Sequence, residues 1–174
     1  MLVQRRFKEI FAGMLKPDFY YHSILQIGIA QLESLKVEAV ICDLDNTLLE
    51  WKAKKISPEI KSWLLEVEQA GISVCILSNA LASRASQATE ELDFPVIAPA
   101  FKPRKKQFEV AVDTLAVDKS RVAMIGDQLF TDILGANRVG LISILIDPLS
   151  EKDFLSTKVV RLVEKKIKKC LKLK

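Results

Sequence analysis

Short apolar runs alternate with helix-like segments from about residue 37 onward, and this alternation constrains the fold more than any other feature of the chain. The apolar runs are rich in β-branched residues, which is typical of buried strands. We expect strands at residues 37–42, 72–77, 96–98, 122–125 and 142–146. We expect helices at residues 58–70, 83–92, 105–116 and 131–139. Strands and helices in this order predict an α/β fold of three layers, with a parallel sheet of about five strands between two helical layers.

The length of 174 residues and the hydrophobic content of 49% suit one domain with a sizeable core. We expect a core at residues 37–150, preceded by a basic and apolar segment at 1–36 that packs on it. The net charge of +4 is unevenly spread, because residues 151–174 carry nine Lys or Arg and three Asp or Glu. That tail has a net charge of +6, so residues 1–150 have −2, and a nucleic-acid partner is not expected.

The tail has the pattern of a basic amphipathic helix. Its apolar positions recur at helical spacing, and they are Leu155, Val159, Leu162, Val163, Ile167, Cys170 and Leu171. Lysines and an arginine line the other face, so the helix either lies on an anionic membrane or packs on the domain with its charges solvated. The three cysteines form no disulfide framework or zinc motif, and no apolar stretch is long enough to span a bilayer. We therefore expect a cytoplasmic protein, with peripheral membrane contact as an alternative.

Polar side chains follow four of the predicted strands. Asp43, Asp45 and Thr47 follow the first, Ser78-Asn79 the second, Lys102-Pro103 the third, and Gly126-Asp127 the fourth, with Asp132 five residues later. Ligands of open α/β sheets bind outside the carboxyl ends of the strands, so we expect these groups to converge there. Clustered carboxylates need a cation, and oxygen ligands favour Mg²⁺. A lysine and a hydroxyl can bind a phosphate, and a carboxylate beside that phosphate can act as the nucleophile.

The order DxDxT, Ser-Asn, Lys-Pro and GDxxxxD resembles the haloacid dehalogenase (HAD) superfamily over roughly residues 37–147. The strings LKPD, DLDNTL and GDQLFTDILGANRVG are similar to those of the YqeG-type subfamily. That group is in turn similar to mitochondrial and plastid phosphatidylglycerophosphate phosphatases. The resemblance implies a HAD-like Rossmannoid fold and a Mg²⁺-dependent phosphatase.

The resemblance also implies roles for the motif residues. Asp43 would be the nucleophile, and Asp45 would protonate the leaving oxygen and then activate water. The metal ligands would be Asp43, the backbone carbonyl of Asp45, and Asp127. Gln128 stands where some members have a second acid, so ligation there would be confined to Asp127.

The remaining motif residues would hold the phosphate or support the site. Ser78, Asn79 and Lys102 would bind the phosphoryl group. Thr47 belongs with this phosphate-binding set and would also help to orient Asp45. Asp132 would position Lys102 or a metal-bound water.

The spacing between motifs leaves no room for a cap domain, so the site should be open unless a neighbouring subunit of an oligomer closes it. An open site and a basic tail agree with a lipid substrate, phosphatidylglycerophosphate, which would yield phosphatidylglycerol. The alternatives are a phosphatase for a soluble or nucleic-acid phosphate, and a binding module that uses the fold as a scaffold. Trp51 beside the site is either a core residue or a substrate or membrane contact, and His22 is expected to be a surface or capping residue.

Overall fold

The computed structural model describes residues 13–150 and 155–171, and it contains an open parallel sheet of six strands. The strands are β1 (Phe19–Tyr21), β2 (Ala39–Cys42), β3 (Ser73–Leu77), β4 (Val96–Ile97), β5 (Val122–Gly126) and β6 (Ile142–Ile146). Their order across the sheet is β1-β6-β5-β2-β3-β4, and every neighbouring pair is parallel. The predicted α/β fold with a parallel sheet is therefore confirmed.

Strand β1 is an additional strand that the sequence pattern did not predict. It lies within the N-terminal segment 1–36 and pairs with β6 in the register Phe19↔Ile144. The Asp18 carboxylate supports this pairing, because it accepts hydrogen bonds from Ser143 N at 2.8 Å and Ser143 Oγ at 3.0 Å. A strand of three residues is too short to show an alternating pattern, and only its pairing with β6 defines it.

All but the last of the helices connect successive strands, as they do in parallel sheets, and the last helix follows β6. The helices are α2 (Ile29–Ser34), α3 (Pro58–Gln69), α4 (Ala82–Ala88), α5 (Lys105–Leu115), α6 (Leu134–Val139) and α7 (Leu155–Cys170). Single 3₁₀ turns are found at Ile24–Gln26 and Lys119–Arg121, and a π-helical turn at Leu129–Ile133 leads into α6. Helix α3 begins after Ser57, whose hydroxyl accepts from Ile60 N at 3.4 Å, as expected of an N-cap.

Helix α4 is shorter than the predicted helix at 83–92. Its last turn is closed by Thr89, whose hydroxyl donates to the carbonyl oxygen of Ala85 at 2.9 Å. A hydroxyl that bonds back to the preceding turn competes with helix propagation. The chain leaves the helix there, and Leu92 packs against the core.

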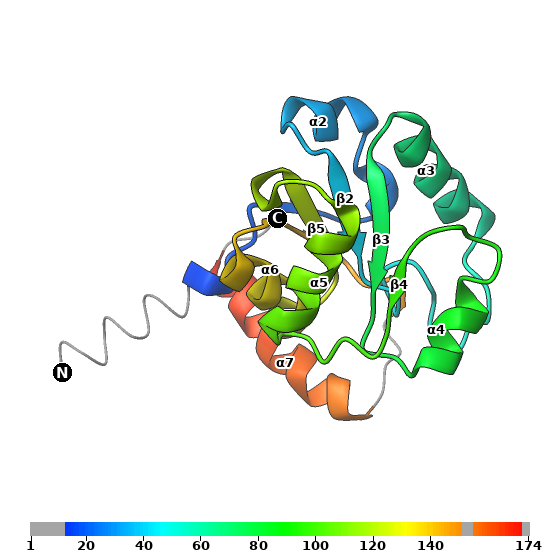
Figure 1. The fold of residues 1–174 in the computed structure, drawn as a ribbon. Helices are drawn as coiled ribbons and strands as arrows, with labels where there is room; N and C mark the ends of the chain where they lie inside the picture. The colour runs from blue at the N-terminus through cyan, green and yellow to red at the C-terminus, as the bar shows by residue number, and fades with distance from the viewer. Residues whose placement is uncertain (1–12, 151–154, 172–174) are drawn as a thin grey trace.

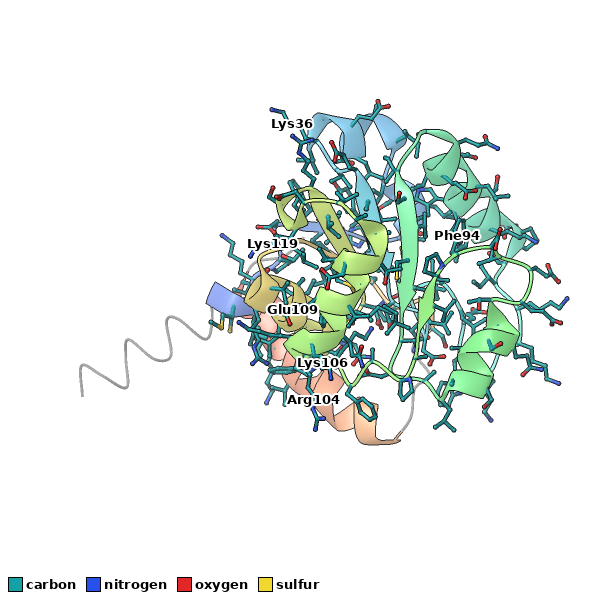
Figure 2. All side chains as sticks on the ribbon, in the orientation of Figure 1. Lys36, Phe94, Arg104, Lys106, Glu109 and Lys119 are labelled. Atoms are coloured by element: carbon teal, nitrogen blue, oxygen red, sulfur yellow. The ribbon has the colours of Figure 1, made fainter. Side chains whose placement is uncertain are left out.

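Two apolar clusters lie on opposite faces of the sheet and give the three layers. On one face Val40, Cys42 and their neighbours pack against α2, α3 and α4. On the other face Ala39 and Ile41 pack against α5 and α6. Successive residues of β2 thus point into different clusters, which explains the unbroken apolar run. Figure 1 shows the strands between α3 on one side and α5 with α6 on the other. Charged side chains such as Lys106 and Glu109 lie on the exposed face of α5 (Figure 2).

Helix α7 packs on the domain with a face that overlaps the predicted apolar stripe only in part. Ile167 contacts a third apolar cluster that includes Leu15 and Leu145. Glu164, one turn earlier, is buried, and its carboxylate accepts a hydrogen bond from Phe130 N at 3.0 Å. This bond and the Ile167 contact set the rotation of the helix about its axis.

Three members of the predicted apolar stripe are consequently exposed to solvent, and they are Leu162, Val163 and Cys170. The exposed fractions are 66% for Leu162 and 47% for Val163, so the alternative in which the whole stripe packs on the domain is wrong for these residues. The side chains of residues 155–161 lie outside the part that is described, as do residues 1–12, 151–154 and 172–174 of the two predicted terminal segments. None of the described helices combines the length and the apolar character that crossing a bilayer requires.

His22 lies in a polar cluster that joins β1, β6 and α7. Its Nδ1 lies 2.9 Å from Asp147 Oδ2, and Tyr20 donates to Asp147 Oδ1 at 2.8 Å. Lys168 of α7 lies 3.6 Å from the same Asp147 oxygen. The histidine is exposed, as expected of a surface residue.

Candidate functional site

Each strand of the sheet ends at the same edge, and the candidate site is built there. Asp43 directly follows β2, and Asp127 directly follows the neighbouring strand β5. The backbone N–H of Asp43 donates to the carbonyl oxygen of Ile125 at 2.9 Å, so the ladder between the two strands continues into the site. Two carboxylates from strands far apart in the sequence are thereby held side by side.

The loop after β2 is anchored by apolar side chains on both sides of its polar residues. Leu44, Leu48 and Leu49 are all buried in the core. Asn46 has a positive φ of 65°, a conformation that asparagine tolerates better than most residues, and its N–H donates to the carbonyl oxygen of Leu49 at 2.7 Å. The loop therefore turns tightly and presents the Asp45 side chain at the edge of the site.

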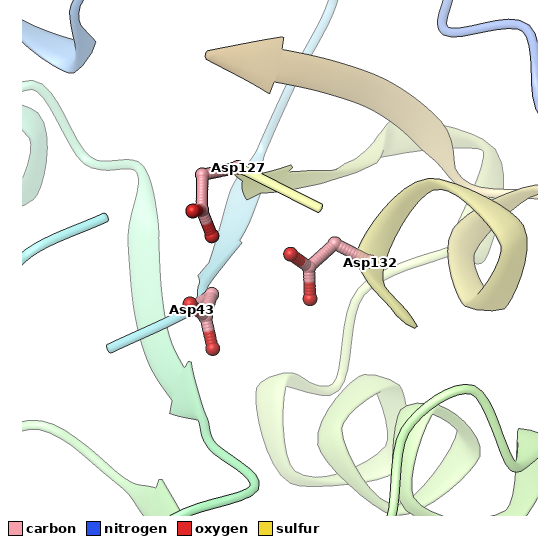
Figure 3. Close-up of side chains that lie close together, drawn as sticks. All are labelled: Asp43, Asp127 and Asp132. Atoms are coloured by element: carbon pink, nitrogen blue, oxygen red, sulfur yellow. The ribbon is translucent and has the colours of Figure 1, made fainter. Parts of the chain in front are cut away.

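Three carboxylates form the centre of the site. Asp43, Asp127 and Asp132 are buried, and each offers an oxygen within 4.8 Å of those of the other two. Figure 3 shows the three side chains close together at the carboxyl ends of β2 and β5. Asp132 approaches the chain so closely that a Cβ atom on Gly126 would lie 2.4 Å from its Cγ. Glycine at position 126 is therefore required by the space that the Asp132 carboxylate occupies.

Lys102 is the cation at this centre. Its Nζ lies 2.5 Å from Asp43 Oδ1 and 2.8 Å from Asp132 Oδ1, and its side chain is 2% exposed. Asn79 holds the lysine backbone, since Asn79 Oδ1 accepts from Lys102 N at 2.7 Å and Asn79 Nδ2 donates to Lys102 O at 3.2 Å. The two motifs that follow β3 and β4 thus act together to place one ammonium group.

The balance of charge at the centre is negative. Burial raises the pKa of Asp43, Lys102 opposes this effect, and Asp132 and Asp127 raise the pKa further. Burial acts to lower the pKa of Lys102, but the carboxylates of Asp132 and Asp43 outweigh it and raise that pKa, so the lysine stays charged. Three carboxylates against one ammonium leave an excess of two negative charges when all are ionised. Oxygen ligands with this excess fit a divalent cation, which would bind between Asp43, Asp127 and Asp132.

The two hydroxyl residues of the motifs are also buried at this edge. Thr47 Oγ1 lies 3.5 Å from Asp127 Oδ1, to which it donates. Ser78 Oγ accepts from the N–H of Ala80 at 3.0 Å, which leaves its own proton available to a ligand. The predicted role of Thr47 in orienting Asp45 stays a prediction, since its described partner is Asp127.

Asp45 is part of the site, but its carboxylate lies outside the acidic centre. Its Oδ1 accepts two hydrogen bonds from Arg84 of α4, from Nη2 at 2.7 Å and from Nε at 3.1 Å. Sequence reasoning missed Arg84, because no motif includes it and its contact with Asp45 spans 39 residues. Its only local signal is a cation in the helix that follows Ser78-Asn79.

The group of residues that could hold a metal in the structure includes Asp132, which the sequence did not predict as a ligand. The prediction combined Asp43 and Asp127 with the backbone carbonyl of Asp45 and gave Asp132 a supporting role. The structure brings the Asp132 carboxylate into the centre, where it serves both as an ion-pair partner of Lys102 and as a potential ligand. The π-helical turn directs it inward, since Asp132 Oδ2 also accepts from Gln128 N at 3.1 Å.

Comparisons with known proteins agree with this geometry. A family model described as haloacid dehalogenase-like hydrolase matches residues 5–140. The "Probable phosphatase YqeG" of Bacillus subtilis (strain 168) is 39% identical over 158 residues, which cover 91% of this chain and 92% of that protein. A ribulose-1,5-bisphosphate 5-phosphatase of Halopiger xanaduensis is 30% identical over 105 residues, covering 55% of this chain and 44% of that protein.

A solved structure shares the fold. An uncharacterized protein from Listeria monocytogenes serotype 4b superposes with a TM-score of 0.53 at 22% identity, covering 68% of this chain and 85% of that chain. At this level of identity the likeness concerns the fold alone. The family model covers most of the chain and the Bacillus relative nearly all of it, so the predicted resemblance to the YqeG type is confirmed. The chain belongs to the haloacid dehalogenase-like hydrolases.

Proposed function

We propose that this protein is a Mg²⁺-dependent phosphomonoester hydrolase that works through a phospho-Asp43 intermediate. The observation that carries the proposal is the position of Lys102, whose ammonium group lies between the carboxylates of Asp43 and Asp132 at the carboxyl edge of the sheet. A phosphoryl group beside this lysine would lie against the Asp43 carboxylate. The similarity of the protein to a probable phosphatase over 91% of its chain supports the same reaction class.

The residues of the site divide the reaction into two steps. In the first, an Asp43 oxygen attacks phosphorus, the bond from phosphorus to the leaving oxygen breaks, and Asp45 gives its proton to that oxygen. In the second, Asp45 takes a proton from water while the water oxygen attacks phosphorus, and the bond to Asp43 breaks to release inorganic phosphate. Lys102 and the Ser78 hydroxyl stabilise the charge on the phosphoryl oxygens in both steps.

The acidic centre is where the metal would act. Asp43, Asp127 and Asp132 would hold Mg²⁺, which when bound supplies charge stabilisation to the phosphoryl group and brings it to the nucleophile. Gly126 leaves the space that the Asp132 carboxylate needs. Thr47 donates a hydrogen bond to Asp127 and so helps to orient that carboxylate.

The open edge supports a lipid substrate, and we infer that it is phosphatidylglycerophosphate. Only the loop at residues 43–57 connects β2 to α3, and only α4 lies between β3 and β4. Two large apolar side chains are exposed beside the motifs: Leu81, 74% exposed, follows Ser78 by three residues, and Phe101, 56% exposed, directly precedes Lys102. Phe101 also has a positive φ of 50°, and the Arg104 guanidinium lies 5.6 Å from its ring centroid. Apolar anchors beside a cation fit a membrane surface with anionic headgroups.

A soluble phosphate is the second candidate, and the Halopiger relative favours it. That relative is named for its action on ribulose 1,5-bisphosphate, but the match covers less than half of its length. The two candidates share the chemistry at Asp43 and differ in whether a lipid surface takes part.

One set of assays tests both the proposed reaction and the proposed lipid substrate. Purified protein with Mg²⁺ is incubated with phosphatidylglycerophosphate in anionic vesicles, with ribulose 1,5-bisphosphate, and with p-nitrophenyl phosphate, and released phosphate is measured. Hydrolysis of the vesicle lipid that Asp43→Asn abolishes supports the whole proposal. Activity on the soluble esters alone would overturn the lipid substrate, and no turnover of any ester would favour the scaffold interpretation.

The exposed apolar pair gives a sharper test of the membrane contact. We expect the double variant Leu81→Ser/Phe101→Ser to sediment less with anionic vesicles and to hydrolyse the vesicle lipid more slowly. Leu65→Ser on α3 is the matched control, because Leu65 is also an exposed leucine, but it lies on a helix away from the motifs. Equal vesicle binding by the double variant and the control would remove the proposed contact.

A further inference from the structure

Arg84 is the one cation that contacts the side chain of Asp45 in the described part of the chain. Its Nη2 and Nε atoms both donate to the same oxygen, Asp45 Oδ1, at 2.7 Å and 3.1 Å. The side chain is 33% exposed and that of Asp45 is 29% exposed, so this pair lies at the open mouth of the site. Lys102, by contrast, is buried beside Asp43.

The guanidinium group has donors to spare. An arginine carries five N–H donors in a planar fork, and the contact with Asp45 uses two of them. No other described residue accepts a hydrogen bond from Arg84. A partly exposed guanidinium with free donors can bind an oxyanion through two parallel hydrogen bonds.

The chemistry of Asp45 places Arg84 beside the leaving group. A residue that protonates the leaving oxygen must come within hydrogen-bond distance of it. The part of the substrate attached to that oxygen therefore lies next to Asp45, and Arg84 is the charged side chain that is found there. The two cations thus serve different parts of a substrate: Lys102 faces the phosphoryl group that is transferred, and Arg84 faces the group that leaves.

We propose that Arg84 binds a second anionic group of the substrate, a phosphate or phosphodiester carried by the leaving alcohol. In the free protein Arg84 is paired with Asp45, and the remaining N–H donors of its guanidinium group bind the second anion. This inference rests on the proposed roles of Asp43 and Asp45, and it selects the class of substrate.

The test compares substrates that differ in whether the leaving alcohol carries a second anionic group. Dioctanoyl phosphatidylglycerophosphate carries a phosphodiester on the leaving glycerol, and glycerol 3-phosphate lacks it. Fructose 1,6-bisphosphate and fructose 6-phosphate form a soluble pair. For each pair we measure kcat/KM in the parent protein, Arg84→Gln, Arg84→Lys and the control Arg121→Gln, whose arginine pairs with Glu38 away from the site.

We expect Arg84→Gln to lower the preference for the doubly anionic member by about 10- to 100-fold, mainly through KM, because a charge-assisted bidentate contact is lost. Arg84→Lys should retain part of the preference, since it keeps the charge without the fork. Arg121→Gln should leave the preference unchanged. An equal fall for both members of each pair would overturn the inference, because Arg84 would then only position Asp45.

A binding measurement separates this inference from the proposed function. In an Asp43→Asn background with Mg²⁺, calorimetry should show that adding Arg84→Gln weakens binding of the doubly anionic ligand and changes binding of its partner much less. Arg84-dependent preference in the fructose pair without lipid hydrolysis would overturn the lipid substrate and support this inference. Lipid hydrolysis with no Arg84-dependent preference in rate or binding would support the lipid substrate and overturn this inference.

Discussion

Lys102 lies 2.5 Å from Asp43 although 59 residues separate them in the chain. Asp43 is placed by β2, at the centre of the sheet, and Lys102 by the loop that follows the edge strand β4. Asn79 spans the gap between these strands, because its side chain bonds the lysine backbone in both directions. The proposed nucleophile and the proposed phosphate-binding cation are thus held in place by hydrogen bonds to their backbone groups.

Replacing Lys102 should destabilise the fold as well as remove activity. In Lys102→Met the buried carboxylates of Asp43 and Asp132 lose their cation, and breaking a buried pair in this way costs about 3–5 kcal/mol. Urea unfolding measures the loss, and Mg²⁺ should restore part of it. Lys106→Met, an exposed lysine of α5, is the control. A loss below that of the control variant would contradict the proposed ion-pair network.

Asp43→Asn should remove hydrolysis without unfolding the protein. The variant cannot form the covalent intermediate, and we expect kcat to fall by a factor of at least about 10⁴. The amide is nearly the same size and relieves the repulsion from Asp127 and Asp132, so stability should not decrease. Asp113→Asn, on the exposed face of α5, should retain full activity. Residual turnover near that of the parent would assign the nucleophile elsewhere.

A divalent metal should stabilise the fold through the acidic centre. Binding to the folded form alone adds about 2.7 kcal/mol at a concentration 100 times the dissociation constant. We expect Mg²⁺ to raise the Tm of the parent protein and to raise that of Asp127→Asn much less. Scanning calorimetry with and without EDTA measures both. The same Mg²⁺-dependent shift in parent and variant would place the metal at another site.

Two glycines should respond differently to alanine. In Gly126→Ala the new Cβ would lie 2.4 Å from Asp132 Cγ, so the carboxylate must move, and a displacement near 1 Å can cost about 10²-fold in rate. In Gly135→Ala the Cβ would meet the buried Phe108 ring at 2.2 Å, which costs about 1–3 kcal/mol of stability through overpacking. Activity and urea unfolding of both variants distinguish the two effects. We expect Gly126→Ala to show the larger loss of activity and the weaker Mg²⁺ response.

The stabilisation supplied by Tyr20 should depend on pH. Burial and the hydrogen bond to Asp147 raise the pKa of Tyr20 to about 12. In the unfolded chain the pKa of tyrosine is about 10, so this contribution is fully present below pH 10 and is lost as the pH rises from about 10 to 12. We expect Tyr20→Phe to be less stable than the parent at pH 8 and the difference to narrow across that window. A difference in unfolding free energy that stays constant from pH 8 to 11 would contradict this assignment.

Local patterns were enough to predict the parallel sheet and the position of the site. The apolar runs that end at Cys42, Leu77 and Gly126 are strands, and the polar groups after them meet at one edge. The Ser57-Pro58 pair begins α3 as expected. These features depend on the order of apolar and polar residues within a few positions, which can be read without knowing what packs against them.

Other features could not be predicted, because they depend on partners far away in the chain. Strand β1 is defined by its pairing with β6, and the orientation of α7 by the Glu164 carboxylate on the Phe130 amide. The helical spacing of Leu162 and Val163 says that they share a face, but it does not say whether that face is covered.

The sequence by itself determined the fold class and the edge of the sheet at which Asp43 and Asp45, the proposed nucleophile and acid–base residue, lie. Only the tertiary structure decided that Asp132 joins the carboxylates of Asp43 and Asp127, and that Arg84 pairs with Asp45. The physical reason is that the order of the strands and the packing of the loops determine which side chains meet. The pKa of each group then depends on charged neighbours that lie far away in the sequence.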